Sequence, residues 1–441
     1  MPKIGFISLG CPKNQVDSEL MLDKLVKAGY EIAASAEEAD AVVINTCGFI
    51  DAAKQEAIDN ILEMGQLKEE GTIRKIIVTG CLAERYRDEI LKEMPEVDAV
   101  MGIGANGDIV KTVEEVFAGE TVSLYPPKKD LPLCGERLLS TPPWWAYLKI
   151  ADGCSNCCTY CAIPQIRGPM RSRTIESCVE EAKTLADKGV KELIVIAQDT
   201  TRYGEDLYGE PKLAALLREL VKIEGLRWIR LLYCYPDRLT DELLETIRDN
   251  DKVLNYIDLP LQHADGRILK AMNRHGDKDS LLALIKKIRS YLPDVVIRTT
   301  FITGFPGEDD AAFEVLSDFV EQAQFDRLGC FAYSAEEGTV AAAMDGQLDE
   351  ATKSRRAELI MQTQYEIFCE RQQRHIGKVY DVLVDGFDEE NLLYLGRTYM
   401  DCIEIDAQVI LSTEDELLPG QFVKAKITGV CDADLVGEVL L

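Results

Sequence analysis

The chain has 441 residues, of which 46% are hydrophobic and 29% charged, with 49 basic against 77 acidic residues and a formal net charge of −28. This length allows two or three domains with cores of their own, and no apolar run reaches the roughly 18 residues that a membrane span needs. Because proteins bind nucleic acids largely through lysine and arginine, the acidic balance does not favour nucleic acid contact and favours a basic protein partner.

The N-terminus, MPKIGFISLG, lacks the charged head and long apolar core of a signal peptide. Fourteen cysteines in a chain without a secretory signal indicate a reducing compartment and metal binding in place of disulfides. We therefore expect a cytoplasmic protein that uses some of its cysteines as metal ligands.

The first region, residues 1–120, alternates short apolar runs with helical patterns. The runs are Lys3–Leu9, Ala41–Asn45 and Lys75–Thr79, and amphipathic stretches begin after them, near Val16, Ala52 and Glu84. This alternation predicts an α/β domain with a doubly wound parallel sheet.

One cysteine follows each of these three predicted strands, namely Cys11, Cys47 and Cys81. Because the carboxyl ends of parallel strands meet at one edge of a sheet, we expect the three thiols to converge there and to hold an iron–sulfur cube with one iron free. The alternative is that all three are buried cysteines acting as small apolar residues. Their equivalent positions favour the cluster.

Residues 121–143 are rich in proline and charge, with Pro126-Pro127, Lys128-Lys129-Asp130 and Pro142-Pro143. Such a stretch cannot sustain a helix and is typical of an interdomain linker. We expect a second domain over residues 144–375, in which six strand candidates alternate with helical stretches. This pattern predicts a partial (β/α)6 barrel with its chemistry at the carboxyl ends of the strands. The candidates are Ala146–Ile150, Glu192–Ala197, Trp228–Tyr233, Tyr256–Leu261, Val295–Thr303 and Arg327–Tyr333.

The most informative stretch, CSNCCTYC, follows the first of these strands. It places Cys154, Cys158 and Cys161 at the spacing C-x3-C-x2-C, and a short loop of this kind can bring three thiolates to one iron–sulfur cube. Three ligands leave one iron open to bind a small molecule. Zinc loops usually pair two separate C-x2-C units, and buried thiols are the other alternative. Cys157 is predicted to be a spectator, although its spacing does not exclude a ligand role.

From residue 376 to 441 the pattern changes to short β-rich runs separated by turn signals, which predicts a small antiparallel β-barrel. This region carries four basic and fourteen acidic residues, a net charge of −10. A barrel so charged should repel phosphate and attract a basic protein.

These motifs resemble a known family. The loop around Cys154, including the aromatic Tyr160 before its last cysteine, resembles the signature of radical S-adenosylmethionine (SAM) enzymes. The segments SLGCPKNQVDSE, NTCGFI and TGCLAERY resemble the N-terminal domain of the methylthiotransferases in that superfamily. The run YLGRT and its position resemble the TRAM-like C-terminal barrel of the family, so the resemblance extends over the whole chain. The residues around these cysteines are most similar to those in the branch that modifies an aspartate of the twelfth small-subunit ribosomal protein.

The resemblance implies two 4Fe-4S clusters, SAM as cofactor and an electron donor as partner. It implies that Cys154, Cys158 and Cys161 hold the cluster that cleaves SAM. It also implies that Cys11, Cys47 and Cys81 hold the cluster that stores sulfur. In the family, stretches at the strand ends contact SAM, which suggests Arg298 for its carboxylate, Gln262 for nearby polar groups and Gly304 for the adenine.

The expected function is therefore the addition of a methylthio group to the β-carbon of an aspartate in a basic ribosomal protein. An unactivated C–H bond is beyond acid–base chemistry and requires a cofactor radical. Two alternatives stay open at this point. One is the same chemistry on a tRNA adenosine, and the other is a non-enzymatic iron–sulfur scaffold or electron carrier.

Overall fold

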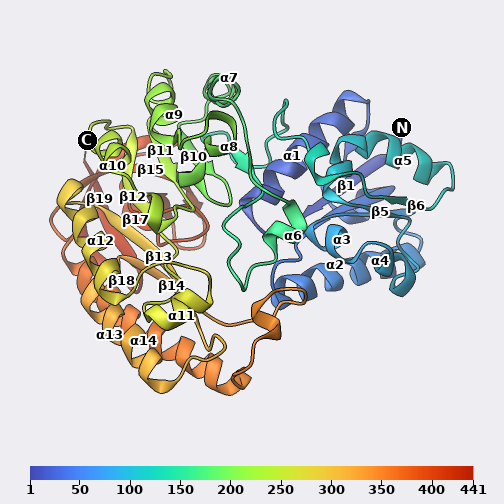
Figure 1. Ribbon diagram of the computed structural model, residues 1–441. Helices are drawn as coiled ribbons and strands as arrows, with labels where there is room; N and C mark the ends of the chain where they lie inside the picture. The colour runs from blue at the N-terminus through green and yellow to red at the C-terminus, as the bar shows by residue number, and fades with distance from the viewer. Residues whose placement is uncertain (441) are drawn as a thin grey trace.

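The computed structural model describes residues 1–440 and divides them among two parallel sheets, a closed barrel and the helices around them (Figure 1). None of the helices within this range is long and apolar enough to cross a bilayer. The α/β class predicted from the sequence is confirmed, as are the two parallel sheets and the C-terminal barrel.

The N-terminal sheet is parallel throughout and has the order β2-β1-β3-β4-β5-β6. Helices α1 and α5 pack on one face and α2 to α4 on the other, so the sheet is doubly wound. Its strands are β1 Lys3–Ser8, β2 Glu31–Ile32, β3 Ala41–Thr46, β4 Lys75–Gly80, β5 Ala99–Met101 and β6 Val122–Leu124. Its helices are α1 Pro12–Lys27, α2 Asp51–Glu69, α3 Cys81–Tyr86, α4 Asp88–Glu93 and α5 Ile109–Phe117, with 3-10 turns η1 Ala36–Glu38 and η2 Ile103–Asp108.

Strand β6 lies inside the stretch that the sequence predicts as linker. It pairs in parallel with β5, so the sheet continues past the boundary expected at residue 120. Three residues between a turn and a proline pair are too few to show a strand pattern. The proline-rich remainder holds the 3-10 turn η3 Lys128–Asp130 and otherwise runs without regular structure to β7.

The central sheet is also parallel, in the order β14-β13-β12-β11-β10-β7, and it stays open between β14 and β7. Each of the six predicted strands is present. The strands are β7 Trp145–Lys149, β10 Glu192–Ile196, β11 Trp228–Leu231, β12 Val253–Asp258, β13 Val296–Thr303 and β14 Arg327–Ala332, and the small hairpin β8 Ala151–Asp152 with β9 Arg171–Ser172 stands apart. The helices are α6 Ile163–Arg167, α7 Ile175–Asp187, α8 Glu205–Tyr208, α9 Leu213–Leu220, α10 Asp241–Arg248, α11 Gly266–Ala271, α12 Lys278–Tyr291, α13 Asp310–Ala323 and α14 Glu350–Gln373, with η4 Thr200–Arg202, η5 Pro236–Arg238 and η6 Ala341–Ala343.

The C-terminal barrel closes in the order β15-β16-β17-β19-β18. The small barrel predicted from the sequence is confirmed, and its strands pair antiparallel except for β17 and β19, which pair in parallel. A closed ring with an odd number of strands cannot alternate direction at every step, so five strands require one parallel pair. Strand β15 has a bulge between Val384 and Gly386. The strands are β15 Val379–Asp388, β16 Leu393–Arg397, β17 Val409–Ser412, β18 Phe422–Cys431 and β19 Asp434–Leu440.

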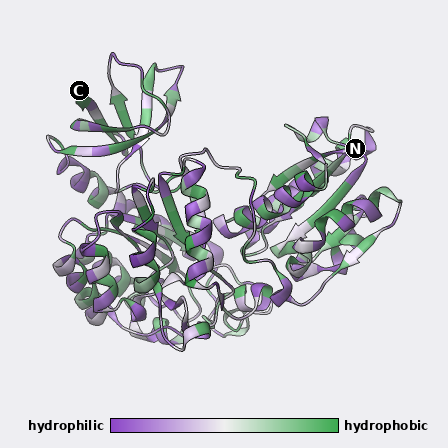
Figure 2. Cartoon of the chain, turned by 90° about the horizontal axis from the view of Figure 1, so that it is seen from above, coloured by the Kyte–Doolittle hydropathy of each residue, from purple (hydrophilic) through white to green (hydrophobic). Residues whose placement is uncertain are grey.

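The barrel docks on the end of the central sheet where its strands begin. Trp145 and Trp228, the first residues of β7 and β11, share one buried cluster with side chains of the barrel. Buried ion pairs join the same surfaces: Arg397 of β16 binds Glu192, the first residue of β10. Figure 2 shows the barrel and the N-terminal domain on different sides of the central domain. The carboxyl ends of the central strands are therefore left to face the N-terminal domain.

Candidate functional site

Three thiols gather at the carboxyl edge of the N-terminal sheet. Cys11 caps the start of α1, Cys47 follows β3, and Cys81 opens α3 directly after β4. Cys47 and Cys81 are buried and Cys11 is half-buried. Gly10, at φ +89°, passes so close that a Cβ on it would lie 2.9 Å from the Cys47 sulfur. The turn before Cys11 therefore packs against Cys47 and needs glycine.

The acidity of these thiols reflects the same crowding. Burial raises the pKa of Cys81 to about 12 and also raises that of Cys47, and in both cases the neighbouring thiols add to the effect. Burial acts in the same direction on Cys11, but the charges of Lys13 and Arg167 outweigh it and lower its pKa. Cys11 contributes to the raised pKa of both Cys47 and Cys81, so the three thiols lie close together.

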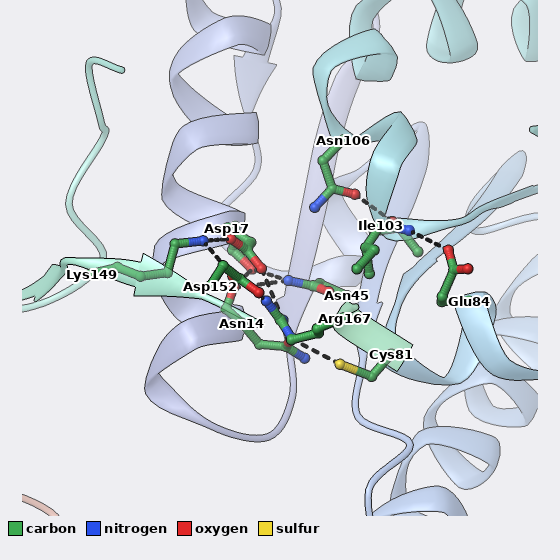
Figure 3. A network of polar contacts seen from close by, with 12 residues as sticks. Asn14, Asp17, Asn45, Cys81, Glu84, Ile103, Asn106, Lys149, Asp152 and Arg167 are labelled. Carbon is green, nitrogen blue, oxygen red and sulfur yellow. Dashed lines mark hydrogen bonds and ion pairs between the residues drawn. The ribbon is translucent and has the colours of Figure 1, made fainter. Parts of the chain in front are cut away.

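A buried network of charges joins this edge to the central domain (Figure 3). Arg167, at the end of α6, donates to Asn14 at 2.6 Å, to Asp17 at 3.0 Å and to Asp152 at 2.7 Å. Lys149, the last residue of β7, binds both carboxylates as well. Two cations thus balance two anions, all of them fully buried. The network fixes the two domains together beside the thiols.

Helix α6 also makes an apolar contact with the first thiol set. It begins two residues after Cys161, and Ala162 and Ile166 form a small buried cluster with Cys81. Helix α6 therefore begins next to the loop of Cys154, Cys158 and Cys161 and packs against Cys81, one of the three N-terminal thiols.

Lys13 crosses the same boundary from the N-terminal domain. Its Nζ lies 3.1 Å from the centre of the Tyr233 ring, which follows β11 at the carboxyl edge of the central sheet. Burial lowers the pKa of Lys13 to about 8.

The second cysteine loop follows β7 and β8. Cys154, Cys158 and Cys161 are half-buried, whereas Cys157 is exposed and has φ +53°. Backbone bonds hold the loop, from Cys154 N to Gly168 O at 3.1 Å and from Cys161 N to Cys158 O at 3.0 Å. Burial raises the pKa of Cys154 to about 11 and that of Cys161 to about 12, and the other thiols of the loop add to both shifts.

An arginine and two tyrosines lie beside this loop. Arg274 has a guanidinium nitrogen 3.9 Å from the Cys158 sulfur and lies 4.3 Å from the centre of the Tyr235 ring. Tyr160 packs against a cluster that includes Met272 and Phe305, and burial holds its pKa well above the usual range. The ring of Tyr160, itself a residue of the loop, therefore anchors the loop on this apolar cluster.

The three other residues predicted to contact SAM lie on β13 and the segments around it. Gln262 has φ +72° and is fixed by backbone bonds to Thr300 and Ile302. Arg298 is already paired, at 2.9 Å, with the carboxylate of Asp258.

Gly304, also at a positive φ of +73°, donates its N–H to Glu308. A Cβ on Gly304 would lie 2.2 Å from Cγ of Lys353, so the chain approaches α14 too closely there for any other residue.

The donor chemistry at both places suits iron. Among residues 1–440, no three cysteine, histidine or carboxylate side chains converge as they would on one metal ion. A cube divides its three protein ligands among three irons. Thiols that lie near one another without meeting at a point are compatible with such a cluster.

A loop of the central domain also holds the N-terminal domain, through a buried carboxylate. Glu336, almost fully buried, accepts from Lys54 at 2.9 Å and from Arg85 at 2.8 Å. Arg85 also donates to the carbonyl of Gly48, next to Cys47. In Figure 1 this loop is the orange segment that reaches α2.

Sequence reasoning missed most of these supporting residues. Lys149 and Arg167 each stand in a short apolar segment, WAYLK and IPQIR, which is the signal that could have indicated buried charges. Glu336 gave no signal, because its partners are more than 250 positions away.

Comparison with known proteins extends over all three units. Residues 3–102 match the uncharacterized protein family UPF0004, residues 148–320 the radical SAM superfamily and residues 376–440 the TRAM domain. The chain is 48% identical to the ribosomal protein uS12 methylthiotransferase RimO of Acetivibrio thermocellus, over 99% of this chain and 98% of that one. It is 48% identical to the protein of the same name from Clostridioides difficile, over 100% and 99%. The corresponding figures for Caldanaerobacter subterraneus are 49%, 99% and 100%.

Solved structures show the same fold at much lower identity. The radical SAM methyltransferase TsrM of Kitasatospora setae, with tryptophan and a SAM analogue bound, has a TM-score of 0.56 at 12% identity, covering 74% of this chain and 72% of its own. The cobalamin-dependent radical SAM enzyme OxsB with SAM bound has a TM-score of 0.53 at 13% identity, covering 83% and 58%.

Proposed function

We propose that this chain, which belongs to the ribosomal protein uS12 methylthiotransferase family, adds a methylthio group to the β-carbon of an aspartate of uS12. As a radical SAM enzyme it uses SAM and a 4Fe-4S cluster. We infer in addition a second 4Fe-4S cluster and an electron donor as partner.

Two sets of three cysteines would hold the clusters. Cys154, Cys158 and Cys161 would hold the one that binds SAM, and the N-terminal set would hold the other: Cys11, Cys47 and Cys81. When bound, these groups supply the radical that removes hydrogen from an unactivated carbon and the methylthio group that replaces it.

The protein's own residues orient and shield this site. Arg274 puts a positive charge beside Cys158, and Arg167 puts another beside Cys81. Because both guanidinium groups are buried, they bring positive charge to the proposed cluster ligands without admitting water. The network of Arg167, Asp17 and Asp152 keeps the two cysteine sets in one orientation.

The observation that carries the proposal is the course of α6. It leaves the second cysteine loop at Cys161 and packs on Cys81, so the two thiol sets are linked by one rigid turn of helix. Two clusters that act on one substrate carbon need this closeness, whereas a carrier of electrons between distant partners does not.

The barrel charge supports a protein substrate. Its net charge of −10 would attract a basic ribosomal protein and disfavour the phosphates of tRNA. We infer a cytoplasmic location from this substrate.

The test begins with iron analysis of anaerobically reconstituted protein. We expect two 4Fe-4S clusters in the unmodified chain and one in each of the single variants Cys11→Ala and Cys154→Ala. Full iron content in Cys11→Ala would refute the second site. Mass spectrometry of uS12 and of tRNA from cells lacking the chain then decides the substrate, since loss of methylthiolation from tRNA and not from uS12 would assign the alternative function.

A further inference from the structure

Lys13 is a buried cation without an anion. The residue is 6% exposed, and within residues 1–440 its ammonium group donates no hydrogen bond and enters no ion pair. Solvent nevertheless reaches Nζ, which is not one of the fully buried side-chain atoms that lack a hydrogen-bond partner. A lysine in such a place has lost most of its hydration without receiving a carboxylate in return.

The ammonium lies at the boundary between the N-terminal and central domains, close to Cys11. Lys13 lies two positions after Cys11, and its Nζ rests on the face of Tyr233. Tyr233 follows β11 at the carboxyl edge of the central sheet, and its φ of +61° is unusual for a side chain of this size. The ring holds the ammonium by a cation–π contact, and the N–H donors that point away from the ring have no hydrogen-bond acceptor among residues 1–440.

The carboxylates nearest to Lys13 are already engaged. Asp258 binds Arg298 at 2.9 Å and accepts the backbone N–H of Tyr233 at 2.8 Å. Asp152 binds Lys149 and Arg167. Once these pairs are formed, no carboxylate of the protein is left for Lys13, and its other anionic neighbour is the Cys11 thiolate. The site can therefore accept an added carboxylate.

We propose that Lys13 binds the side-chain carboxylate of the target aspartate and so selects aspartate over neutral residues. The proposal rests on the proposed function, which places an aspartate of uS12 at this site. The reacting β-carbon is bonded directly to that carboxylate carbon. An ammonium that holds the carboxylate therefore also fixes the carbon to be modified, and Lys13 is a specificity-determining residue.

The competing role for Lys13 is a counter-charge to the Cys11 thiolate, and the experiment separates the two. Binding of purified uS12 to the reconstituted enzyme is measured by competition, with uS12 carrying aspartate or asparagine at the modified position. Lys13→Met removes the charge at nearly constant shape, and Lys13→Arg keeps it. Lys24→Met makes the same charge change on the same helix, where the side chain is only half-buried and has no ion pair among the residues that the structure describes.

We expect the unmodified enzyme and Lys24→Met to bind the aspartate form at least about 10-fold more tightly than the asparagine form, as for a partly desolvated charge pair. This preference should disappear in Lys13→Met and persist in Lys13→Arg. Both variants should keep the iron content of the unmodified enzyme. An aspartate preference that survives in Lys13→Met would overturn the proposal, as would loss of iron from that variant. Methylthiolation of uS12 by the unmodified enzyme is scored separately, so the proposed function can stand when the role of Lys13 fails.

Discussion

Replacing Arg397 by methionine removes the cation that ties the C-terminal barrel to the central domain. Its guanidinium binds Glu192 of β10 at 2.5 Å and Asp385 of β15 at 2.7 and 3.0 Å, and the side chain is 1% exposed. Glu192 keeps one partner, Arg230 at 2.8 Å. Asp385 keeps the indole N–H of Trp144. The substitution therefore leaves the buried carboxylate of Glu192 and the half-buried carboxylate of Asp385 each with half of their partners.

Breaking a buried ion pair by removing one member costs about 3–5 kcal/mol, because the remaining charge is uncompensated. We expect a loss of this size in the free energy that holds the barrel in place. Burial alone would raise the pKa of Glu192, but Arg397 and Arg230 hold it below its usual value. Its contribution to stability is present above the pKa of an unfolded glutamate and is lost as the pH falls through the folded value. In Arg397→Met this loss should begin at a higher pH.

Tryptophan fluorescence during urea unfolding measures this interface directly. The chain has three tryptophans, and all of them, Trp144, Trp145 and Trp228, belong to the cluster shared by the barrel and the central sheet. The control is Arg218→Met, which breaks an exposed pair with Glu242 and should cost less than about 1 kcal/mol. If the two variants unfold at the same urea concentration, the reasoning about the buried pair is refuted.

Three further predictions concern other parts of the chain. Glu336→Ala removes the carboxylate partner of Arg85 and one of the two carboxylate partners of Lys54. It should increase amide hydrogen exchange in residues 334–340 while the central strands stay protected; unchanged exchange would mean that the clasp does not hold the loop. Gly304→Ala should lower stability more than Gly307→Ala. Both alanines bear the roughly 1–2 kcal/mol cost of a left-handed backbone, but only the alanine at 304 would clash with Lys353. Equal losses of stability in thermal unfolding would contradict this. Burial and nearby cations lower the pKa of His375 to about 4. Protonation therefore favours the unfolded chain, and stability should fall from pH 6.5 towards pH 4. His375→Gln should flatten this part of a plot of urea midpoint against pH, and an identical slope would exclude His375 as the cause.

Much of the fold could be predicted because its strands are long and apolar. All six central strands and the three strands that precede cysteines in the N-terminal sheet lie within apolar runs of the sequence. The short strands β2, β5 and β6 were missed, since two or three residues carry no period. The parallel pair β17–β19 was missed because pairing direction depends on how the ring closes and not on the sequence of either strand.

The site was predictable to the extent that its residues occupy equivalent positions. The three strand-end cysteines lie at one edge for a topological reason that a sequence can show. The charges that support them lie in contacts between distant segments: Asp17 meets Lys149, and Arg167 meets Asn14. Arg298 was predicted as a ligand-binding residue from the family resemblance and its place on a strand, and nothing in the sequence indicated that Asp258 would be its partner.

The course of α6 has a consequence for how the enzyme is made. Its contact with Cys81 and the clasp at Glu336 both hold the N-terminal domain against the central domain near the thiols. If the N-terminal thiols hold a cluster, as we propose, a scaffold protein that delivers preformed iron–sulfur units must reach them from outside. Such a protein would then have to act before the two domains close, or wait for them to part.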